Sequence, residues 1–329
     1  MLSRHFLRSK VLQTLYSCNV SDGNDIDVVQ KNFMHNIESF NRLEINQIYT
    51  LVHLRNFAAN FIEEGKQKFI PKEEDKYPNM RFVENAFVAQ LANNADFQRL
   101  CAEYKISFAE QDNVFRKLYS QIRDTDRYKE YMTAAETNYE TDKKFAIDVF
   151  KVLANEPSLI DLFNDQSIVW ESDYMQTAQH VLTILKKTEP TWGTDDPLPL
   201  IFDKSSQKEL DDVEFARELL NRTLLSWNEH VELITKNLNG WEYDRVPVID
   251  IILIKMAITE FINFPSIPEP VTIDEYIELS KEYSTDRSKL FINGILDRIQ
   301  IELRAKGKIQ KSGRGLFNPN LEDEEQQNQ

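Results

Sequence analysis

A group of residues near position 290 combines the side chains that bind a single-stranded nucleic acid. The predicted last helix begins with Arg287 and Lys289, and Phe291 follows Arg287 one turn later on the same face. Cations in a first turn oppose the helix dipole at a cost of roughly 0.3–1 kcal/mol, whereas an anion bound there reverses the sign of the effect. An aromatic ring beside two cations suits a stacked base and its phosphate. The alternative is a core Phe291 with two solvated cations, and the residues alone weigh both equally.

The predicted first helix shows a similar change from apolar to basic residues. Val11 and Leu15 lie on a line of the helix surface that continues toward the N-terminus as Arg8 and Arg4. Such a stripe suits a helix that extends beyond its core and offers cations to an anion. Alternatively, the helix begins later and Arg4 lies in a frayed arm. Tyr16 fits either a core position or the aromatic rim of a groove.

The charge of the chain is acidic as a whole and basic in two places. A net charge of −15 disfavours non-specific nucleic-acid binding by the whole surface. Residues 1–18 contain three basic and no acidic residues, and residues 287–314 contain eight basic against two acidic residues. A local anion site built from both chain ends is compatible with this pattern, although solvated surface is the plainer explanation. Residues 322–329 are acidic and polar, which predicts a disordered tail.

Arrangements typical of enzymes are missing from the sequence. The five histidines are scattered, none forms an HExxH or ExxH pair, and no glycine-rich nucleotide loop or GxSxG motif occurs. Two cysteines are too few for a disulfide framework and fit a reducing compartment. The sequence has no apolar run typical of a signal peptide or a membrane span. We therefore expect a cytoplasmic protein that is not an enzyme and that uses neither a cofactor nor a metal.

The hydrophobic periodicity predicts an all-α fold. Glycine and proline are too scarce to supply the turns of a β-rich domain. Helices are expected at residues 4–18, two within 26–69, and then at 82–104, 108–122, 126–139, 142–153, 173–187, 210–238, 246–264, 273–283 and 285–305. Residues 192–200 are expected to be a loop.

Several local signals mark the ends and contacts of the later helices. Asn239-Gly240 is a C-cap signal after the long helix at 210–238. Thr272 and Glu275 have the spacing of a capping box, and Ser284 or Thr285 can cap the last helix. Gly294 lies inside that helix, where it costs about 1 kcal/mol relative to Ala, which suggests close approach of another backbone.

The C-terminal third and the first helix carry a set of ordered motifs. The motifs are FARELL (215–220), Trp241 with Asp244-Arg245, DIILIKMAITEF (250–261), VTIDEYIELSKEYS (271–284), SKLFINGILDRI (288–299) and, at the N-terminus, RSKVLQTLYS (8–17). On these motifs, which lie mainly between Phe215 and Arg298, the chain resembles the NusB family of bacterial transcription antitermination factors.

The resemblance implies a fold, partners and a function. The fold would consist of two small helical bundles with the first helix near the last. The protein would bind boxA RNA of ribosomal RNA transcripts together with NusE, a ribosomal protein, and act indirectly on the RNA polymerase elongation complex. The RNA-binding residues carried over are Arg4, His5, Arg8, Tyr16, Arg287, Lys289 and Phe291. Weaker candidates for the NusE-facing side are Val246, Asp250 and Lys255.

The chain departs from compact members of the family by a long acidic insertion. We expect the first helix at 1–20, a helical insertion at 21–205, the NusB-like core at 206–306 and a basic, then acidic flexible tail at 307–329. The insertion is either a stabilising cap on the bundle or a second interaction domain. The basic start of the family is also thinner here, because Phe6 and Lys10 interrupt it.

Two other classes of protein remain open on these residues. The first is a protein-interaction module with a NusB-like fold and weak or no RNA binding, which the thin N-terminal arginines favour. The second is an enzyme with a NusB-like accessory domain, as in some RNA methyltransferases. The missing glycine-rich cofactor loop argues against the enzyme.

Overall fold

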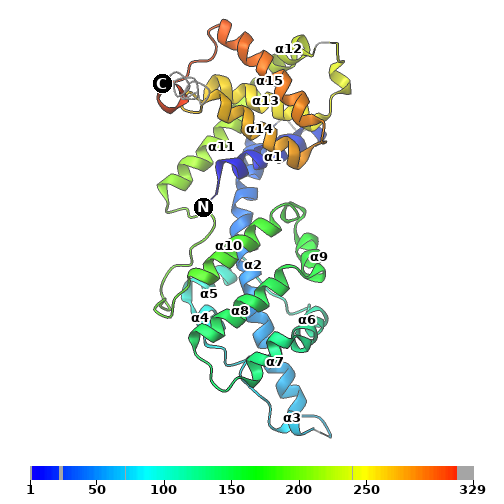
Figure 1. Cartoon of the computed structure of the whole chain (residues 1–329), viewed down its shortest axis with the longest axis vertical. Helices are drawn as coiled ribbons and strands as arrows, with labels where there is room; N and C mark the ends of the chain where they lie inside the picture. Colours follow the sequence, from blue (N-terminus) through cyan, green and yellow to red (C-terminus); the bar gives the residue numbers. More distant parts are fainter. Residues whose placement is uncertain (1, 22–24, 71, 239, 317–329) are drawn as a thin grey trace, which may run out of the picture. The chain divides into compact units, whose positions relative to one another are not determined.

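The computed structural model of the chain describes residues 2–21, 25–70, 72–238 and 240–316. Every regular element in these ranges is a helix, which confirms the predicted all-α fold (Figure 1). The described residues divide into two compact units. Unit 1 combines residues 1–37 with the chain from residue 204 onward, and unit 2 comprises residues 38–203. The division thus places the start of the second helix with the N-terminal and C-terminal parts.

Unit 1 is built around one helix that is apolar on all sides. Its helices are α1 (Arg4–Ser21), the first part of α2 (Ile26–Lys66), α11 (Gln207–Leu225), α12 (Trp227–Asn237), α13 (Val248–Asn263), α14 (Glu269–Tyr283) and α15 (Ser288–Ala305). α13 packs against α1, α11, α12, α14 and α15, and every residue from Asp250 to Phe261 is buried. A helix that is hydrophobic around its whole circumference is stable only in such surroundings.

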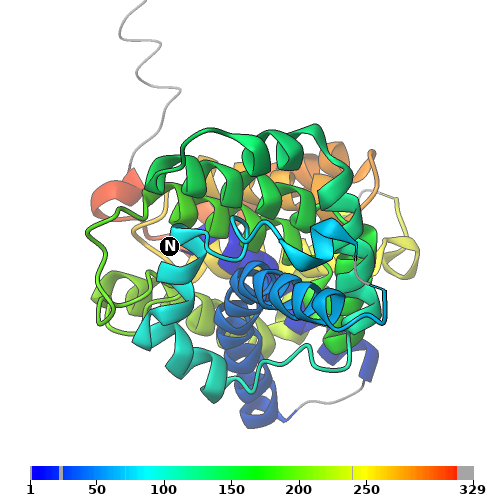
Figure 2. The ribbon, with the colours of Figure 1, turned by 90° about the horizontal axis from the view of Figure 1, so that it is seen from below.

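Unit 2 contains the rest of α2 and the helices of the expected insertion. They are α3 (Glu73–Lys76), α4 (Ala86–Asn93), α5 (Ala95–Glu103), α6 (Asp112–Asp124), α7 (Asp126–Thr133), α8 (Tyr139–Ala154), α9 (Pro157–Gln166) and α10 (Tyr174–Lys187). In Figures 1 and 2 the later part of α2 runs among the cyan and green helices of this unit. A continuous aromatic and aliphatic core joins them, so unit 2 has a hydrophobic core of its own.

Several helix boundaries differ from the prediction. Residues 82–104 form α4 and α5 instead of one helix, and α9 was not predicted. α2 is a single helix of 41 residues instead of two, because no proline or glycine interrupts its apolar stripe before Gly65. The predicted helix at 210–238 breaks at Ser226 into α11 and α12, although no helix breaker marks this position. Asn239 of the predicted C-cap lies outside the described residues, and Gly240 has φ +89°, a left-handed conformation that favours glycine.

The capping predictions near α14 and α15 are wrong. α14 begins at Glu269 instead of Ile273, and the Thr272 hydroxyl donates a hydrogen bond to Glu260 rather than capping the helix. α15 begins at Ser288, and its N-cap residue Arg287 makes no side-chain capping bond. Gly294 has no other backbone close by, since the nearest atom to an added Cβ would be a side-chain nitrogen of Arg298 at 3.8 Å.

The chain after α15 packs on the end of α13. The Ser312 amide donates to the Pro265 carbonyl at 3.0 Å, and Lys311 Nζ donates to the Phe264 carbonyl at 3.0 Å. An added Cβ at Gly315 would lie 1.9 Å from the Pro265 carbonyl oxygen, so only glycine fits there. The first residues of the segment expected as a tail are therefore part of unit 1, whereas residues 317–329 lie outside the described ranges.

Candidate nucleic-acid interface

The turn before α15 is held by a chain of hydroxyl groups that ends on a buried carboxylate. Ser284 Oγ donates to Asp250 Oδ1 at 2.5 Å and lies 2.9 Å from Ser288 Oγ, which is also 2.9 Å from Thr285 Oγ1. Asp250 is buried in the first turn of α13. Because buried hydrogen-bonded networks fix one conformation, these contacts set the direction in which α15 begins.

Two cations stand at this helix start without a partner. The side chains of Arg287 and Lys289 are exposed, and within the described residues neither makes a hydrogen bond or an ion pair. The first turn of α15 contains no acidic residue. Positive side chains, free amide groups of the first turn and the helix dipole therefore reinforce one another, which favours an anion at this end of α15.

An aromatic pair adjoins the two cations. Phe291 is half-buried, and its ring centroid lies 5.8 Å from that of Trp241 at an interplanar angle of 52°. Trp241 is 62% exposed, which is unusual for so large an apolar side chain. The sequence prediction included Phe291 and missed Trp241 as a site residue. The available signal was a tryptophan directly after a predicted turn, outside the apolar face of any predicted helix.

Tyr16 lies on the half of α1 that reaches this region. Gln13 Nε2 donates to the Tyr283 hydroxyl at 3.3 Å, which ties α1 to the last residue of α14, immediately before the turn described above. Tyr16 follows Gln13 at the i+3 position and is 44% exposed. The structure thus brings the second half of α1 and the start of α15 to one part of unit 1.

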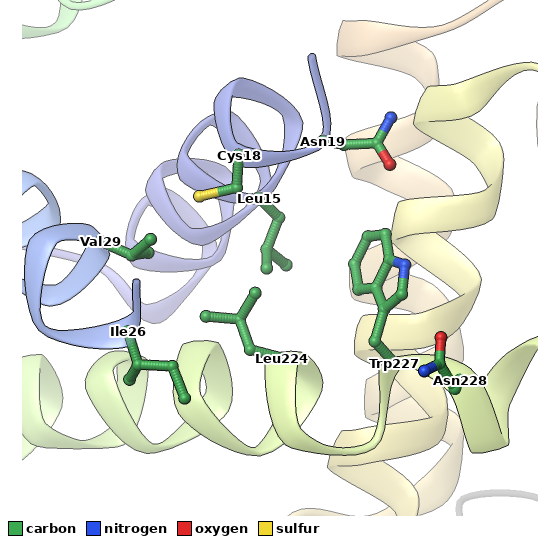
Figure 3. A pocket seen from close by; sticks show the side chains of 8 residues that line it. All are labelled: Leu15, Cys18, Asn19, Ile26, Val29, Leu224, Trp227 and Asn228. Carbon is green, nitrogen blue, oxygen red and sulfur yellow. The ribbon is translucent and has the colours of Figure 1, made fainter. Parts of the chain in front are cut away.

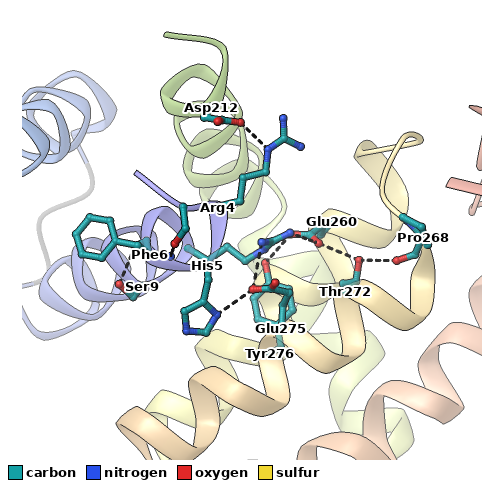
Figure 4. Close-up of polar contacts among 12 residues, drawn as sticks. Arg4, His5, Phe6, Ser9, Asp212, Glu260, Pro268, Thr272, Glu275 and Tyr276 are labelled. Atoms are coloured by element: carbon teal, nitrogen blue, oxygen red, sulfur yellow. Dashed lines mark hydrogen bonds and ion pairs between the residues drawn. The ribbon is translucent and has the colours of Figure 1, made fainter. Parts of the chain in front are cut away.

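The basic residues at the other end of α1 are bound to carboxylates of unit 1 (Figure 4). Arg8 is only 2% exposed, and its guanidinium donates to both oxygens of Glu260 at 2.8 Å. Arg4 Nε donates to Asp212 Oδ1 at 2.7 Å, and its guanidinium lies 4.8 Å from the Phe215 ring centroid. Arg8 therefore joins α1 to α13 in the core, while Arg4 keeps an exposed outer face.

His5 bridges α1 to α14 through two carboxylates. Its Nδ1 lies 2.9 Å from Glu275 and its Nε2 lies 3.0 Å from Glu282. Burial alone would lower the pKa of His5, but the two hydrogen-bonded carboxylates outweigh burial and raise it. Burial likewise opposes the charge of Arg8, and Glu260 raises the pKa of Arg8 above its ordinary value. Carboxylates inside the domain thus favour the charged form of each side chain.

Glu260 is the residue at the centre of this network, and sequence reasoning did not single it out. Besides Arg8, it accepts hydrogen bonds from the hydroxyls of Thr272 at 2.9 Å and Tyr276 at 3.2 Å. Its carboxylate raises the pKa of Tyr276, together with the larger effect of burial. A carboxylate in an otherwise apolar helix run is the signal that marks such a buried partner.

The three candidates for the NusE-facing side are all buried. Val246 packs in the core, and Asp250 holds Ser284 as described above. Lys255 is 0% exposed, its Nζ has no hydrogen-bond partner within the described residues, and this atom lies 3.5 Å from the Trp227 ring centroid. In unit 1 the exposed positions at the start of α13 are instead Pro247 and Val248.

Neither a metal-type side-chain cluster nor a membrane-spanning helix occurs in the described ranges. No group of three or more His, Cys, Asp or Glu side chains there has the arrangement of a metal site. No helix in the same ranges is both long and apolar enough to cross a membrane.

An all-helical unit that presents two cations, unpaired within the described residues, beside the exposed Trp241 and the half-buried Phe291 defines a candidate RNA-binding helical domain. In a comparison with known proteins, residues 192–300 match the family model described as NusB family. Two relatives are both named transcription antitermination protein NusB.

The relative from Salinibacter ruber is 43% identical over 104 residues, which are 32% of this chain and 65% of that protein. The relative from Chloroherpeton thalassium is 39% identical over 103 residues, which are 31% of this chain and 49% of that protein. The chain therefore spans less than two thirds of the length of either relative. No solved structure matches the chain significantly.

Proposed function

We propose that the protein is a transcription antitermination or elongation factor that binds boxA-type single-stranded RNA together with NusE during ribosomal RNA transcription. It acts by binding alone, in the cytoplasm, without catalytic chemistry or a cofactor, and its effect on RNA polymerase is indirect. The names of the two relatives support the general role. The cations at the start of α15, unpaired within the described residues, and the adjoining rings of Phe291 and Trp241 support RNA as the ligand.

The observation that carries the proposal is the absence of partners for Arg287 and Lys289 within the described residues. Several other basic side chains of unit 1, such as Arg8 and Arg304, are paired with a carboxylate. Two exposed cations in a helix first turn are unfavourable unless an anion joins them. RNA phosphates supply that anion, and bases adjacent to them can stack on Phe291 and Trp241.

The N-terminal candidates take different parts in this proposal. Tyr16 flanks a splayed base, since it is exposed near the start of α15. The outer face of Arg4 contacts a phosphate from the opposite end of α1. His5 and Arg8 act indirectly, because their contacts with α13 and α14 fix the position of α1.

NusE is proposed to complete the RNA-binding surface next to the start of α13. Val248 is exposed there, and its near neighbours in the sequence, Val246 and Asp250, are buried. In this arrangement Asp250 is a positioning residue, because it holds the Ser284 hydroxyl and with it the turn before α15. Lys255 acts only through its contact with Trp227 in the core.

The test is fluorescence anisotropy of a labelled boxA RNA and a scrambled RNA, each with and without NusE. We expect preferential binding of boxA that strengthens when NusE is present. Replacing Trp241 or Phe291 by Ala should weaken boxA binding by about 5- to 150-fold, the range measured for single stacking contacts.

The matched control is Leu225→Ala, which removes another exposed apolar side chain of unit 1 and should leave RNA binding unchanged. Equal, weak binding of both RNAs would contradict the proposal and favour a protein-interaction module with a NusB-like fold. If Phe291→Ala binds RNA normally but unfolds at a lower temperature, Phe291 is a core residue instead.

A further inference from the structure

Unit 1 contains a pocket beside the proposed RNA surface, and its lining includes neither Phe291 nor Trp241. It has a volume of about 330 Å³ and lies where α1, the start of α2, α11 and α12 meet (Figure 3). Six of its eight lining residues are apolar or sulfur-containing, and the other two are asparagines. They are Leu15, Cys18, Asn19, Ile26, Val29, Leu224, Trp227 and Asn228.

The break between α11 and α12 creates this pocket. The helix stops at Ser226, so Trp227 opens α12, and its indole points from this junction toward Asn19 of α1 (Figure 3). Lys255 Nζ lies over one face of the indole, 3.5 Å from the ring centroid. Lys255 is completely buried, so this contact anchors the indole from the core, and Trp227 is also one of the residues that line the pocket. The ring is thus a supported, flat apolar surface.

The composition of the pocket selects a neutral, planar ligand with polar edges. No charged side chain lines it, so an ionised metabolite would find no counter-charge there. The apolar side chains of Leu15 and Leu224 face the space beside the indole. Asn19 and Asn228 are exposed at its edge, and within the described residues neither side-chain amide has a hydrogen bond. An aromatic face with primary amides at its rim is how proteins hold an unstacked base.

The position of the pocket connects it with the proposed RNA path. Asn19 follows Tyr16 by three residues on α1, so both side chains lie on the same face of this helix. An RNA strand that passes Tyr16 can therefore place a neighbouring base at Asn19. The volume is near the lower end of the roughly 300–1,000 Å³ of ligand pockets, which suits one small ring system and not a larger ligand.

We infer that this pocket accepts one splayed nucleobase of the bound RNA, stacked on Trp227 and hydrogen-bonded at its edge by Asn19 and Asn228. The sugar and phosphate of that nucleotide stay outside, next to Tyr16. This inference rests on the proposed function and adds a base-reading site to it. An apolar side chain of a protein partner is the rival occupant, but it would leave the two amides unused.

The test combines RNAs that lack one base at a time with a variant that lacks both amides. Wild-type protein should lose about 10-fold in affinity when one particular base is removed, because stacking and edge contacts are lost together. The double variant Asn19→Ala/Asn228→Ala should bind the intact RNA more weakly and should no longer respond strongly to removal of that base. Both asparagines are exposed, so the variant is expected to fold. Asn113→Ala, an exposed asparagine of α6, is the matched control and should behave as wild type.

The outcomes separate this inference from the proposed function. If RNA binds and depends on Arg287 and Lys289, but the double variant responds to every missing base as wild type does, the pocket does not hold a base and the proposed function stands. If the double variant binds NusE more weakly but binds RNA as wild type does, the pocket holds a protein side chain and the inference is overturned. If wild-type protein binds no RNA, both the proposed function and the inference fail.

Discussion

Replacing Lys255 by Met should stabilise unit 1, because this lysine is buried without a hydrogen-bonding partner. Its side chain is fully covered, its Nζ has no acceptor within the described residues, and burial lowers its pKa from 10.5 to about 7. Methionine has a similar length and an apolar end, so it fills the same space without a charge.

The expected gain follows from the pKa and from the contact with Trp227. A shift of one pKa unit corresponds to about 1.36 kcal/mol. The lowering of the Lys255 pKa from 10.5 to about 7 therefore corresponds to a cost of about 5 kcal/mol for burying the charged lysine near neutral pH. The cation–π contact with Trp227 offsets about 2 kcal/mol of this cost. We therefore expect Lys255→Met to raise the free energy of unfolding by about 2–3 kcal/mol, in the range seen when buried charges are replaced by apolar residues.

The same lysine predicts a pH dependence with a definite sign. Between its folded pKa of about 7 and its ordinary value of 10.5, the unfolded chain binds the proton and the folded chain does not. The free energy of unfolding should therefore rise with pH in this window, and Lys255→Met should remove this contribution.

Hydrogen exchange of the slowest amides of α13 measures the stability of unit 1 without requiring the whole chain to unfold in one step. The matched control is Lys311→Met: Lys311 Nζ donates to the Phe264 carbonyl, so this variant should be less stable. A Lys255→Met protein less stable than wild type near pH 7, or a wild type whose stability does not rise toward pH 9, would refute the reasoning.

Three further changes test the contacts of unit 1. Arg8→Ala should lower the free energy of unfolding by about 3–5 kcal/mol, because it leaves the buried Glu260 carboxylate without its cation. In urea unfolding, the double variant Arg8→Met/Glu260→Gln should recover much of this lost stability. His5→Gln should lower the melting temperature at about pH 5.5 more than at about pH 8.5. The reason is that a raised histidine pKa gives stability that is present below the ordinary pKa and lost as pH rises through the folded one; equal losses would contradict this. Gly315→Ala should undock the segment after α15, since its Cβ would meet the Pro265 carbonyl, and unchanged hydrogen exchange of this segment would refute that packing.

The sequence predicted the fold class well because helix formation here depends on local patterns. The apolar stripe of α13 and the scarcity of glycine and proline are visible without knowing any tertiary contact. Helix boundaries were harder to predict, because no glycine or proline marks the break at Ser226 in the sequence. Local propensity does not contain this information.

The sequence predicted some site residues better than others, because a basic residue in a sequence does not show which carboxylate it pairs with in the fold. Arg8 and Arg287 both stand near helix starts, yet the partner of Arg8 is Glu260, which lies more than two hundred residues further along the chain. Only the folded structure separates a cation that is neutralised in the core from one that stays exposed. Trp241 was missed for the opposite reason, since its contact with Phe291 joins two segments whose proximity no local pattern shows.

The most direct test of the central claim is the salt dependence of RNA affinity for wild type and for Arg287→Gln/Lys289→Gln. If both cations contact phosphates of a single strand, the slope of log K against log salt should become shallower by about 1.4, at about 0.7 for each contact. The control Lys186→Gln/Lys187→Gln removes two exposed cations of α10 and should keep the wild-type slope. A double variant at positions 287 and 289 whose slope and affinity equal those of wild type would contradict the claim that RNA binds at the start of α15.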